Sequence, residues 1–531
     1  MSITSFTFVL FIFAVMIVYY LIPRKWQWTV LLAASCVFYL MGGKKAFLFV
    51  LITAASVYFA ARLMQNMSDA RKAYLKEHKK ELSKEEKKVY KKKIQNKRKW
   101  IMIAALVLNI GLLCVFKYFH FALEQINAII SIAGGTTITD TFKLIVPLGI
   151  SFYTFQATGY LVDVYWENIS AEKNFAKFLL FVSFFPQMTQ GPISEFEQLS
   201  KELFSGHELL YENYSRGFQR MLWGFMKKML LANLIAPYVT DVFKNYPEYT
   251  GITVFVGALM YSVQIYADFS GYMDIMCGMC EMFGIHLAEN FERPYFSKSV
   301  AEYWRRWHIT LGAWFKRYIY FPVAMSNWSR KLAWSSRKRF GKFFSDTLPA
   351  TIALVVVWFC TGLWHGASWA YIIWGLVNGF FIILSLWLDK LYIIWKRALH
   401  INESKWAWRA FQTIRTFILV TFIKVLPEVG TLSDGWGLWM RIFTEHSIPH
   451  GIHELLPALA ANGNKNFCII LAMILLQFIF SLLQRKKPVR DYINRVPIAV
   501  RMTVMACCVI LIIVFGIPAT AGKGGFMYAQ F

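Results

Sequence analysis

The amino-acid sequence predicts an all-α polytopic membrane protein with about a dozen transmembrane helices and further re-entrant or interfacial helices. Of its 531 residues, 57% are hydrophobic and 17% are charged, whereas soluble domains carry about a quarter charged residues. Apolar runs of the ~18–20 residues that cross a bilayer recur along the chain, and no internal repeat is visible. We therefore expect one membrane unit rather than a string of soluble domains.

The expected spans follow from the apolar runs in order. The first, Ser5 to Ile22, lacks a basic n-region and a small-residue cleavage site, so it predicts a membrane helix rather than a signal peptide. The spans are 5–22, 26–43, 46–64, 100–119, 144–166, 174–192, 252–284, 348–364, 367–388, 410–427, 467–484 and 498–516. Two aromatic but charged stretches, Tyr214–Phe243 and Tyr295–Val323, fit interfacial helices or re-entrant segments that line a polar cavity.

The distribution of charge predicts the topology. The formal net charge is +26, and residues 71–99 alone hold fourteen Lys/Arg against four Glu between two apolar runs. Basic loops beside membrane helices stay on the cytoplasmic face, so we expect a solvated cytoplasmic loop near anionic lipid and no nucleic-acid partner. Three spans before this loop place the N-terminus outside, and one span after the basic cluster Arg485–Arg495 places the C-terminal tail outside.

We expect four segments along the chain. Residues 1–119 form N-terminal transmembrane helices with a basic cytoplasmic loop, and 120–390 form the core. Residues 391–516 form C-terminal transmembrane helices, and 517–531 form an extracytoplasmic tail.

Two histidines stand in unusual surroundings. His308 follows two tryptophans and two arginines in the stretch Tyr303–Tyr318, and His365 lies in Gly362-Leu-Trp-His365-Gly366 between two apolar runs. An ionisable side chain in a membrane segment is costly to bury and indicates function, and imidazole suits proton transfer near neutrality. These residues alone leave open a general base acting on a hydroxyl, a proton relay in a transporter, and a purely structural hydrogen bond. No G-x-S-x-G, P-loop or H-E-x-x-H motif is present.

Other metal-ligand or redox candidates are weaker. His446, His450 and His453 lie close together beside Glu454, but Pro449 interrupts a regular helix there, so a solvated outer loop is favoured over a metal site. The Cys277-Gly-Met-Cys280 pair lies in an apolar segment with no second cysteine pair, which favours helix packing. We expect no bound metal.

Five segments carry a resemblance to a known family: Pro147–Trp166, Phe184–Ser194, Gln264–Met276, Asn290–Val323 and Thr361–Gly379. Their order and content resemble the membrane-bound O-acyltransferase (MBOAT) family, and within it the branch of the alginate O-acetylation membrane proteins. The sequence departs from that branch after Pro322, where it reads Val-Ala-Met-Ser-Asn instead of a Leu-Gly-Gly-type turn.

The resemblance implies an MBOAT fold, with helices around a central tunnel that an acyl donor enters from the cytoplasm and a hydroxyl acceptor reaches from the other side. His365 matches the family's catalytic position, and His308 matches the polar position that accompanies it. Independently of the resemblance, we expect the positive charges of Arg305, Arg306 and Lys316 to attract the phosphate groups of the acyl donor. Further residues expected to line the tunnel or the site are Trp304, Trp307, Trp364, Asn378, Gln264 and Asp268.

The last six residues, FMYAQF, resemble the aromatic ending of the same branch. Tyr528 carries the only hydroxyl among them, so we expect it to accept the acyl group transiently and pass it on. The alternative is an interfacial aromatic anchor.

The resemblance therefore implies an O-acyltransferase of the bacterial cytoplasmic membrane that moves acetyl groups across the bilayer for O-acetylation of an exported or cell-wall polysaccharide. The expected donor is acetyl-CoA, with no bound cofactor, and the expected partner is a secreted or membrane-anchored extracytoplasmic acetyltransferase. D-alanyl transfer to teichoic acid and peptidoglycan O-acetylation are alternatives within the class. A proton-coupled transporter is an alternative outside it, although the paired half-repeats of such proteins are not found.

Overall fold

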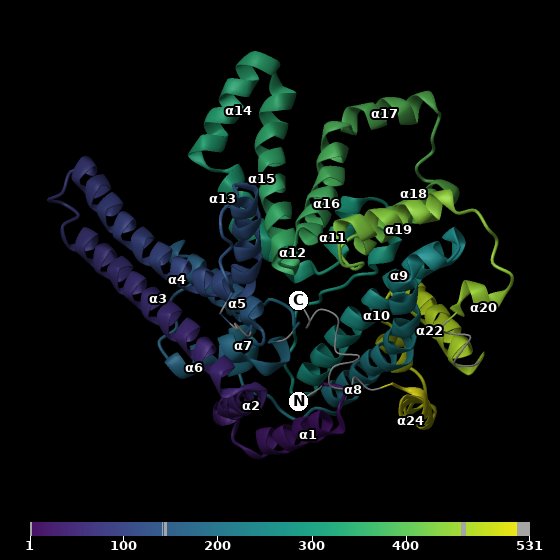
Figure 1. Cartoon of the computed structure of the whole chain (residues 1–531). Helices are drawn as coiled ribbons and strands as arrows, with labels where there is room; N and C mark the ends of the chain where they lie inside the picture. The colour runs from purple at the N-terminus through teal and green to yellow at the C-terminus, as the bar shows by residue number, and fades with distance from the viewer. Residues whose placement is uncertain (1–2, 141, 143–145, 189, 458–463, 518–531) are drawn as a thin grey trace. The chain divides into compact units, whose positions relative to one another are not determined.

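The computed structural model describes residues 3–140, 142, 146–188, 190–457 and 464–517 (Figure 1). Over these ranges the regular structure is helical, with one isolated β-bridge between Phe291 and Trp307. The predicted all-α class is therefore confirmed. Tyr528 and the rest of the predicted tail from 518 onward lie outside the described residues.

Seven of the described helices are long and apolar enough to cross a membrane. They are α3 (Lys44–Glu77), α4 (Lys84–Ile132), α10 (Gly251–Met282), α15 (Lys342–His365), α16 (Trp369–Trp387), α22 (Asn464–Leu483) and α24 (Ile498–Phe515). The other five expected spans each contain a helix that is shorter or carries more charge, and in the span 174–192 the α-helix ends at Ser183. These helices are α1 (Phe6–Leu21), α2 (Gln27–Gly42), α5 (Ile150–Tyr165), α6 (Phe175–Ser183) and α18 (Trp406–Val425). A multi-pass membrane protein is thus confirmed, and the count of a dozen spans stays a prediction.

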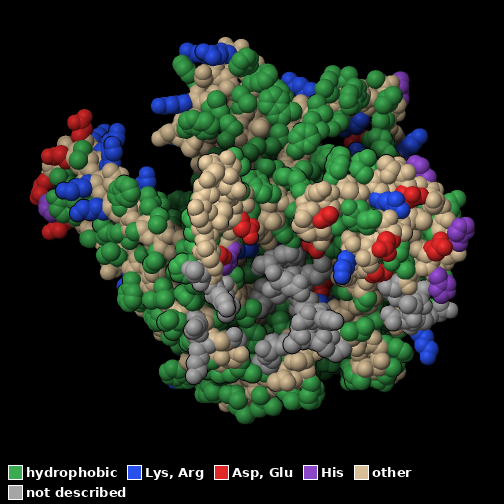
Figure 2. Space-filling model, viewed as in Figure 1, with side chains coloured by type: hydrophobic (Ala, Val, Ile, Leu, Met, Phe, Trp, Pro, Cys, Tyr) green, Lys and Arg blue, Asp and Glu red, His purple; other side chains and the backbone are tan. Residues whose placement is uncertain are grey.

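The chain forms two compact units, of which one contains 7–210 and 283–287, and the other contains 211–282 and 288 onward. In the first unit α3 and α4 form a long antiparallel hairpin (Figure 1). The basic segment 71–99 was expected to be a loop, and that expectation is wrong, because only residues 78–83 interrupt the two helices. Lysine, glutamate and alanine are good helix formers, so the helices continue past their apolar runs, and charged side chains gather at the hairpin tip in Figure 2.

A charged cluster ties this hairpin to the residues that follow α5. The carboxylate of Glu167 accepts hydrogen bonds from Ser68 at 2.7 Å, Arg71 at 2.7 Å and Arg98 at 2.6 Å. Partial burial raises the pKa of Glu167, but the hydrogen bond from Ser68 and the charges of Arg71, Arg98 and Lys72 outweigh it and hold the pKa at about 2. The cluster also compensates the charge of Arg98, whose side chain is 1% exposed.

In the second unit, α8 (Tyr211–Phe225), the π-helical segment η3 (Met226–Ala232) and α9 (Asn233–Lys244) form one helical run that packs against α10 (Figure 1). Glycines of the two antiparallel helices meet: a Cβ atom at Gly278 would lie 2.5 Å from the Gly217 carbonyl oxygen, and one at Gly224 would lie 2.6 Å from the Gly271 carbonyl oxygen. Side chains larger than hydrogen are therefore excluded, and the backbones touch, as small residues permit between membrane helices.

The second unit contains several further short and long helices. The short element η4 (Tyr246–Glu248) joins α9 to α10. The short elements in and around the stretch Tyr303–Tyr318 are η5 (Pro294–Phe296), α11 (Val300–Arg306), α12 (Ile309–Phe315), π-helical η6 (Lys316–Tyr320) and α13 (Phe321–Ala324). The remaining helices are α14 (Asn327–Phe340), which packs antiparallel to α15, then α17 (Asp389–Ala398), α19 (Leu432–Thr444), α20 (Ile452–Leu455) and α23 (Val489–Ile493).

The two charged aromatic stretches thus behave differently. The first, 214–243, is a continuous helix whose polar side chains line a cavity, in line with the cavity-lining alternative. The second, 295–323, is broken into short helices by left-handed and extended residues.

Substitution of Gly278 by alanine is expected to weaken the contact between α8 and α10 by about 1–3 kcal/mol or more, because the added methyl group meets backbone atoms that cannot rotate away. Gly111 in α4 is the matched control, since a Cβ atom there meets no heavy atom within 4 Å. Thermal unfolding of the purified variants should show a lower midpoint for Gly278→Ala only; equal midpoints would contradict the packing argument.

Substitution of Glu167 by glutamine should lower the free energy of unfolding by about 2 kcal/mol at neutral pH, because it leaves Arg98 buried beside a neutral group. The folded-state pKa lies below the unfolded value, so this contribution is complete above about pH 4.5 and is lost as the pH falls toward 2. Denaturation measured between pH 3 and pH 7 should therefore show the difference shrinking at the acid end. Glu197→Gln, which breaks an exposed pair with Lys201, is the control and should change little.

Candidate active site

His308 is held in place by the segment that precedes α11. The β-bridge between Phe291 and Trp307, with hydrogen bonds from Glu292 N to Arg306 O (3.0 Å) and from Ile309 N to Asn290 O (3.1 Å), closes residues 290–309 into a loop. His308 follows the bridge with φ of 49°, in the left-handed region that few non-glycine residues adopt. Such strain at a buried polar residue points to a functional constraint.

The side chain of Asn290 determines which nitrogen of His308 carries the proton. Its Oδ1 accepts hydrogen bonds from the Thr310 backbone N–H (3.0 Å) and hydroxyl (2.9 Å), which fixes this atom as the acceptor. His308 Nδ1 lies 3.3 Å from the same oxygen and therefore donates to it. The other ring nitrogen, Nε2, is then left as a proton acceptor. Burial lowers the pKa of His308 to about 3, so the ring is neutral at physiological pH.

His365 is the last residue of α15 and is 4% exposed. Three aromatic rings surround its imidazole: Trp364 and Trp374 lie edge-on, each with a centroid distance of 4.8 Å, and Tyr371 lies nearly parallel at 6.4 Å. The Trp364 indole also lies edge-on to His308, with a centroid distance of 5.8 Å. The two histidines that the sequence singled out are therefore brought to one indole ring.

A small cavity of about 30 Å³ lies beside His365. This is room for one or two water-sized groups. Its lining combines aromatic rings with an imidazole, an amine and a carboxyl group: Tyr261, Ile265, Trp304, Trp307, His365, Tyr371, Trp374, Lys424, Pro427 and Glu428.

Two of the residues that line this cavity, Lys424 and Glu428, were not predicted from the sequence as site residues. The Lys424 amine, 5% exposed, donates to the Tyr295 hydroxyl at 2.9 Å and lies 3.9 Å from the centre of the Trp307 ring. Among the described residues no carboxylate lies within ion-pair distance of it. Glu428 is hydrogen-bonded by Tyr261 and Tyr371, and burial raises its pKa. The sequence did contain a signal for Lys424, because it is one of only two charged residues in the apolar run 410–427, together with Arg415.

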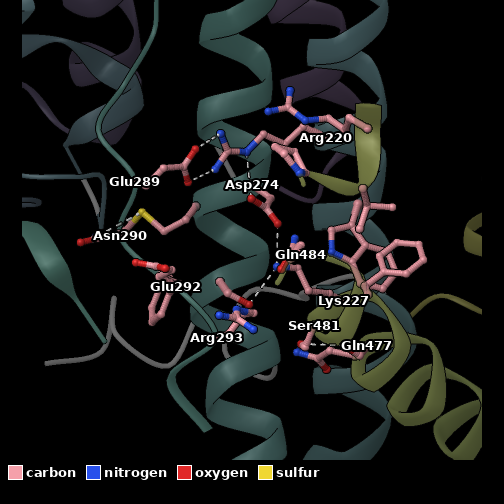
Figure 3. Close-up of a pocket in the computed structure, with 18 of the residues that line it drawn as sticks. Arg220, Lys227, Asp274, Glu289, Asn290, Glu292, Arg293, Gln477, Ser481 and Gln484 are labelled. Carbon is pink, nitrogen blue, oxygen red and sulfur yellow. Dashed lines mark hydrogen bonds and ion pairs between the residues drawn. The ribbon is translucent and has the colours of Figure 1, made fainter. Parts of the chain in front are cut away.

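A larger polar cavity of about 420 Å³ lies on the other side of Asn290, between α8, α10 and α22–α23 (Figure 3). Arg220 pairs with Asp274 (2.9 Å) and, through two hydrogen bonds of 2.6 and 2.7 Å, with Glu289. Lys227 reaches Asp274 at 2.7 Å and Ser270 at 2.9 Å. Asn290 lines this cavity and also contacts His308, so one residue separates the cavity from the histidine, which itself lines neither cavity.

The remaining predicted site residues divide into two groups. Trp304 lines the cavity beside His365 and donates from its indole nitrogen to Asn378 Oδ1 at 3.0 Å, so these two residues belong to the site. Gln264 and Asp268 are buried on α10 but line neither cavity, and Asp268 pairs with Lys228.

The proposed donor-binding residues are not brought to either cavity. Arg305 is exposed, Arg306 pairs with Glu302 at 2.7 Å, and the Lys316 amine lies over the Phe321 ring at 5.7 Å. The cations that line the polar cavity are Arg220, Lys227, Arg293 and Arg490. Within the described ranges, no group of three His, Cys, Asp or Glu side chains could hold a metal ion.

Residues 167–336 match the model of MBOAT, the membrane-bound O-acyltransferase family. The match contains His308 and ends before His365. The chain is 31% identical over 350 residues to the probable alginate O-acetylase AlgI of Azotobacter vinelandii, covering 66% of this chain and 64% of that protein. It is 30% identical over 335 residues to the peptidoglycan O-acetyltransferase of Helicobacter pylori, covering 58% of each chain.

A teichoic acid D-alanyltransferase of Streptococcus thermophilus is 26% identical over 312 residues, which cover 56% of this chain and 72% of the relative. The chain spans a little less than two thirds of the length of the alginate relatives it matches.

Substitution of Lys424 by methionine separates a structural from a functional role. A buried amine with no carboxylate partner is costly to desolvate, and methionine keeps the length of the side chain. We expect the unfolding temperature to be unchanged or higher, while acyl transfer, the activity in the relatives' names, falls at least about tenfold. Lys405→Met, at an exposed position before α18, is the control. A variant that loses stability and activity in parallel would make Lys424 a structural residue.

Proposed function

We propose that this chain, whose residues 167–336 form a domain of the membrane-bound O-acyltransferase family, is an acyltransferase that moves an acetyl group from acetyl-CoA to a hydroxyl of an exported or cell-wall polysaccharide. The observation that carries the proposal is the convergence of His308 and His365 on the Trp364 ring, beside a cavity of a few atoms' size. Acetyl is the acyl group because the more similar relatives are named for O-acetylation.

In the proposed reaction, His365 takes the proton of the attacking hydroxyl as its oxygen forms a bond to the thioester carbonyl carbon. The carbon–sulfur bond then breaks, and the CoA thiolate receives the proton, so the products are the acetyl ester and free CoA. Positioned proton transfer of this kind contributes about 10²–10⁴-fold in rate.

In this proposal His308 orients the attacking hydroxyl and does not itself take up its proton. Its Nδ1–H is directed to Asn290, and its Nε2 can accept a hydrogen bond from the attacking hydroxyl. With a pKa of about 3, the ring does not titrate between pH 5 and pH 8 and so holds the hydroxyl in the same way over that range.

The outer part of the pathway is also proposed. Tyr528 receives the acetyl group and passes it to a secreted or membrane-anchored acetyltransferase on the outer face of the bacterial cytoplasmic membrane. The alternating basic and apolar segments support this orientation through the positive-inside rule. Peptidoglycan is the second candidate acceptor, favoured by the 30% identity to the enzyme of Helicobacter pylori named for that acceptor.

The test uses purified protein in nanodiscs with radiolabelled acetyl-CoA, following label on the chain and release of free CoA. We expect His365→Ala to lower CoA release by about 10²–10⁴-fold, His308→Ala to lower it less, and Tyr528→Phe to remove the label on the chain. His450→Ala, at an exposed histidine, is the control.

Three results would change the proposal. Full CoA release by His365→Ala would remove that residue from the chemistry. Unchanged polysaccharide acetylation by Tyr528→Phe would mean direct transfer, with the tail as an anchor. No turnover of acetyl-CoA by wild type, with or without an extracytoplasmic partner, would indicate a D-alanyl donor instead.

A further inference from the structure

A groove of about 290 Å³ lies between α18 and α22, beside the polar cavity. Its walls are mostly apolar and include Ile414 and Phe417 of α18 and Ile474 and Phe478 of α22. Ile414 and Phe478 are 58% and 51% exposed, so the groove is open on the side where these two helices present apolar side chains outward. In a membrane protein this side faces hydrocarbon chains.

One end of the groove is cationic. Arg293 lines both the groove and the polar cavity, and its guanidinium makes no hydrogen bond or ion pair with the described residues. Partial burial is the largest cause that lowers the pKa of Arg293; the charges of Arg306 and Arg485 lower it further, and those of Glu292 and Glu302 raise it. Because Arg306 and Glu302 pair with each other, Arg485 is the nearby cation that can act together with Arg293. Figure 3 shows Arg293 in the same part of the cavity as Gln477 and Ser481, which also line the groove.

The groove extends over most of one leaflet. Its α22 lining runs from Ile474 to Ser481, over which the helix advances about 10 Å at 1.5 Å per residue, and Arg485 follows one turn later, beyond the end of α22. Half of the ~30 Å hydrocarbon core of a bilayer is ~15 Å. The apolar walls therefore cover about two thirds of one leaflet, and Arg485 lies beyond them, on the side of the headgroups.

We propose that this groove binds an anionic phospholipid, with an acyl chain between α18 and α22 and the phosphate at Arg293 and Arg485. The occupant is a lipid rather than a CoA donor because the groove is mostly apolar and opens where α18 and α22 present apolar side chains outward, whereas the nucleotide and pantetheine parts of CoA are polar. The charge complementarity selects an anionic headgroup over a zwitterionic one.

The bound lipid also bears on the candidate site. Arg293 has φ of 47° and begins the loop that continues through Tyr295, the hydrogen-bond partner of Lys424, to His308. A phosphate at Arg293 holds this strained turn, so anionic lipid should stabilise the loop that carries His308. This inference does not depend on the proposed acetyl transfer, because its readout is lipid binding and stability.

The test adds phosphatidylglycerol or phosphatidylcholine of the same chain length to the full-length protein in neutral detergent. It measures the unfolding temperature and the lipid retained after delipidation. We expect phosphatidylglycerol to raise the unfolding temperature by a few degrees and to be retained, and phosphatidylcholine or inorganic phosphate to do neither. Arg485→Gln and Arg293→Gln should reduce the shift by half or more, and Ile474→Trp, which fills the groove, should abolish it.

Arg397→Gln, at an exposed position on α17, controls for the loss of one surface charge. If Arg397→Gln lost as much of the phosphatidylglycerol-induced rise in unfolding temperature as Arg485→Gln does, the effect would be one of non-specific charge. That result would overturn the proposal. A full shift with inorganic phosphate that persists in Ile474→Trp would identify a free-anion site and overturn the lipid assignment. Because Arg485→Gln leaves the strained turn unchanged, failure of Arg293→Gln to fold would not prevent the test.

Discussion

Where α8 crosses α10, four glycines bring two helix backbones into direct contact, and the charged residues of the second unit depend on that closeness. At such a separation Arg220 and Lys227 of the first helical run reach Asp274 of α10, and Lys228 reaches Asp268. These charges would be very costly to bury singly. Because the glycines bring the two helices close together, the opposite charges form ion pairs that compensate one another. A polar cavity can therefore exist next to helices that are otherwise apolar.

The same helix α10 supports the loop that carries His308. Phe269 of α10 lies edge-on to the His308 ring at 4.8 Å, and Asn290, a few residues after α10 ends, fixes the tautomer of that histidine. The strained backbone at His308 is thus maintained by contacts on several sides, which is the condition under which such strain persists. Geometry at the histidine is therefore a consequence of helix packing as well as of the local sequence.

The polar groups around His365 are a single amine and a single carboxyl group rather than a network of ion pairs. The cavity beside it is lined by the buried amine of Lys424 in α18 and by the half-buried carboxyl group of Glu428, which lies in the turn after α18; each is hydrogen-bonded to tyrosine. Tyrosine hydroxyls can serve a neutral or a charged partner, so the cavity tolerates a change of protonation without a large rearrangement. A site that must receive and release a proton benefits from that tolerance.

The sequence by itself determined the all-α class, the membrane character and the two histidines, because apolar run length and rare intramembrane ionisable groups are local signals. It mispredicted the basic segment 71–99 as a loop, since charge clustering does not oppose helix formation by lysine and glutamate. Only the tertiary structure decided that Trp364 lies against both histidines, that Asn290 orients one of them, and that Lys424 shares the cavity of the other. These are contacts between residues far apart in the chain, and the packing of whole helices determines them.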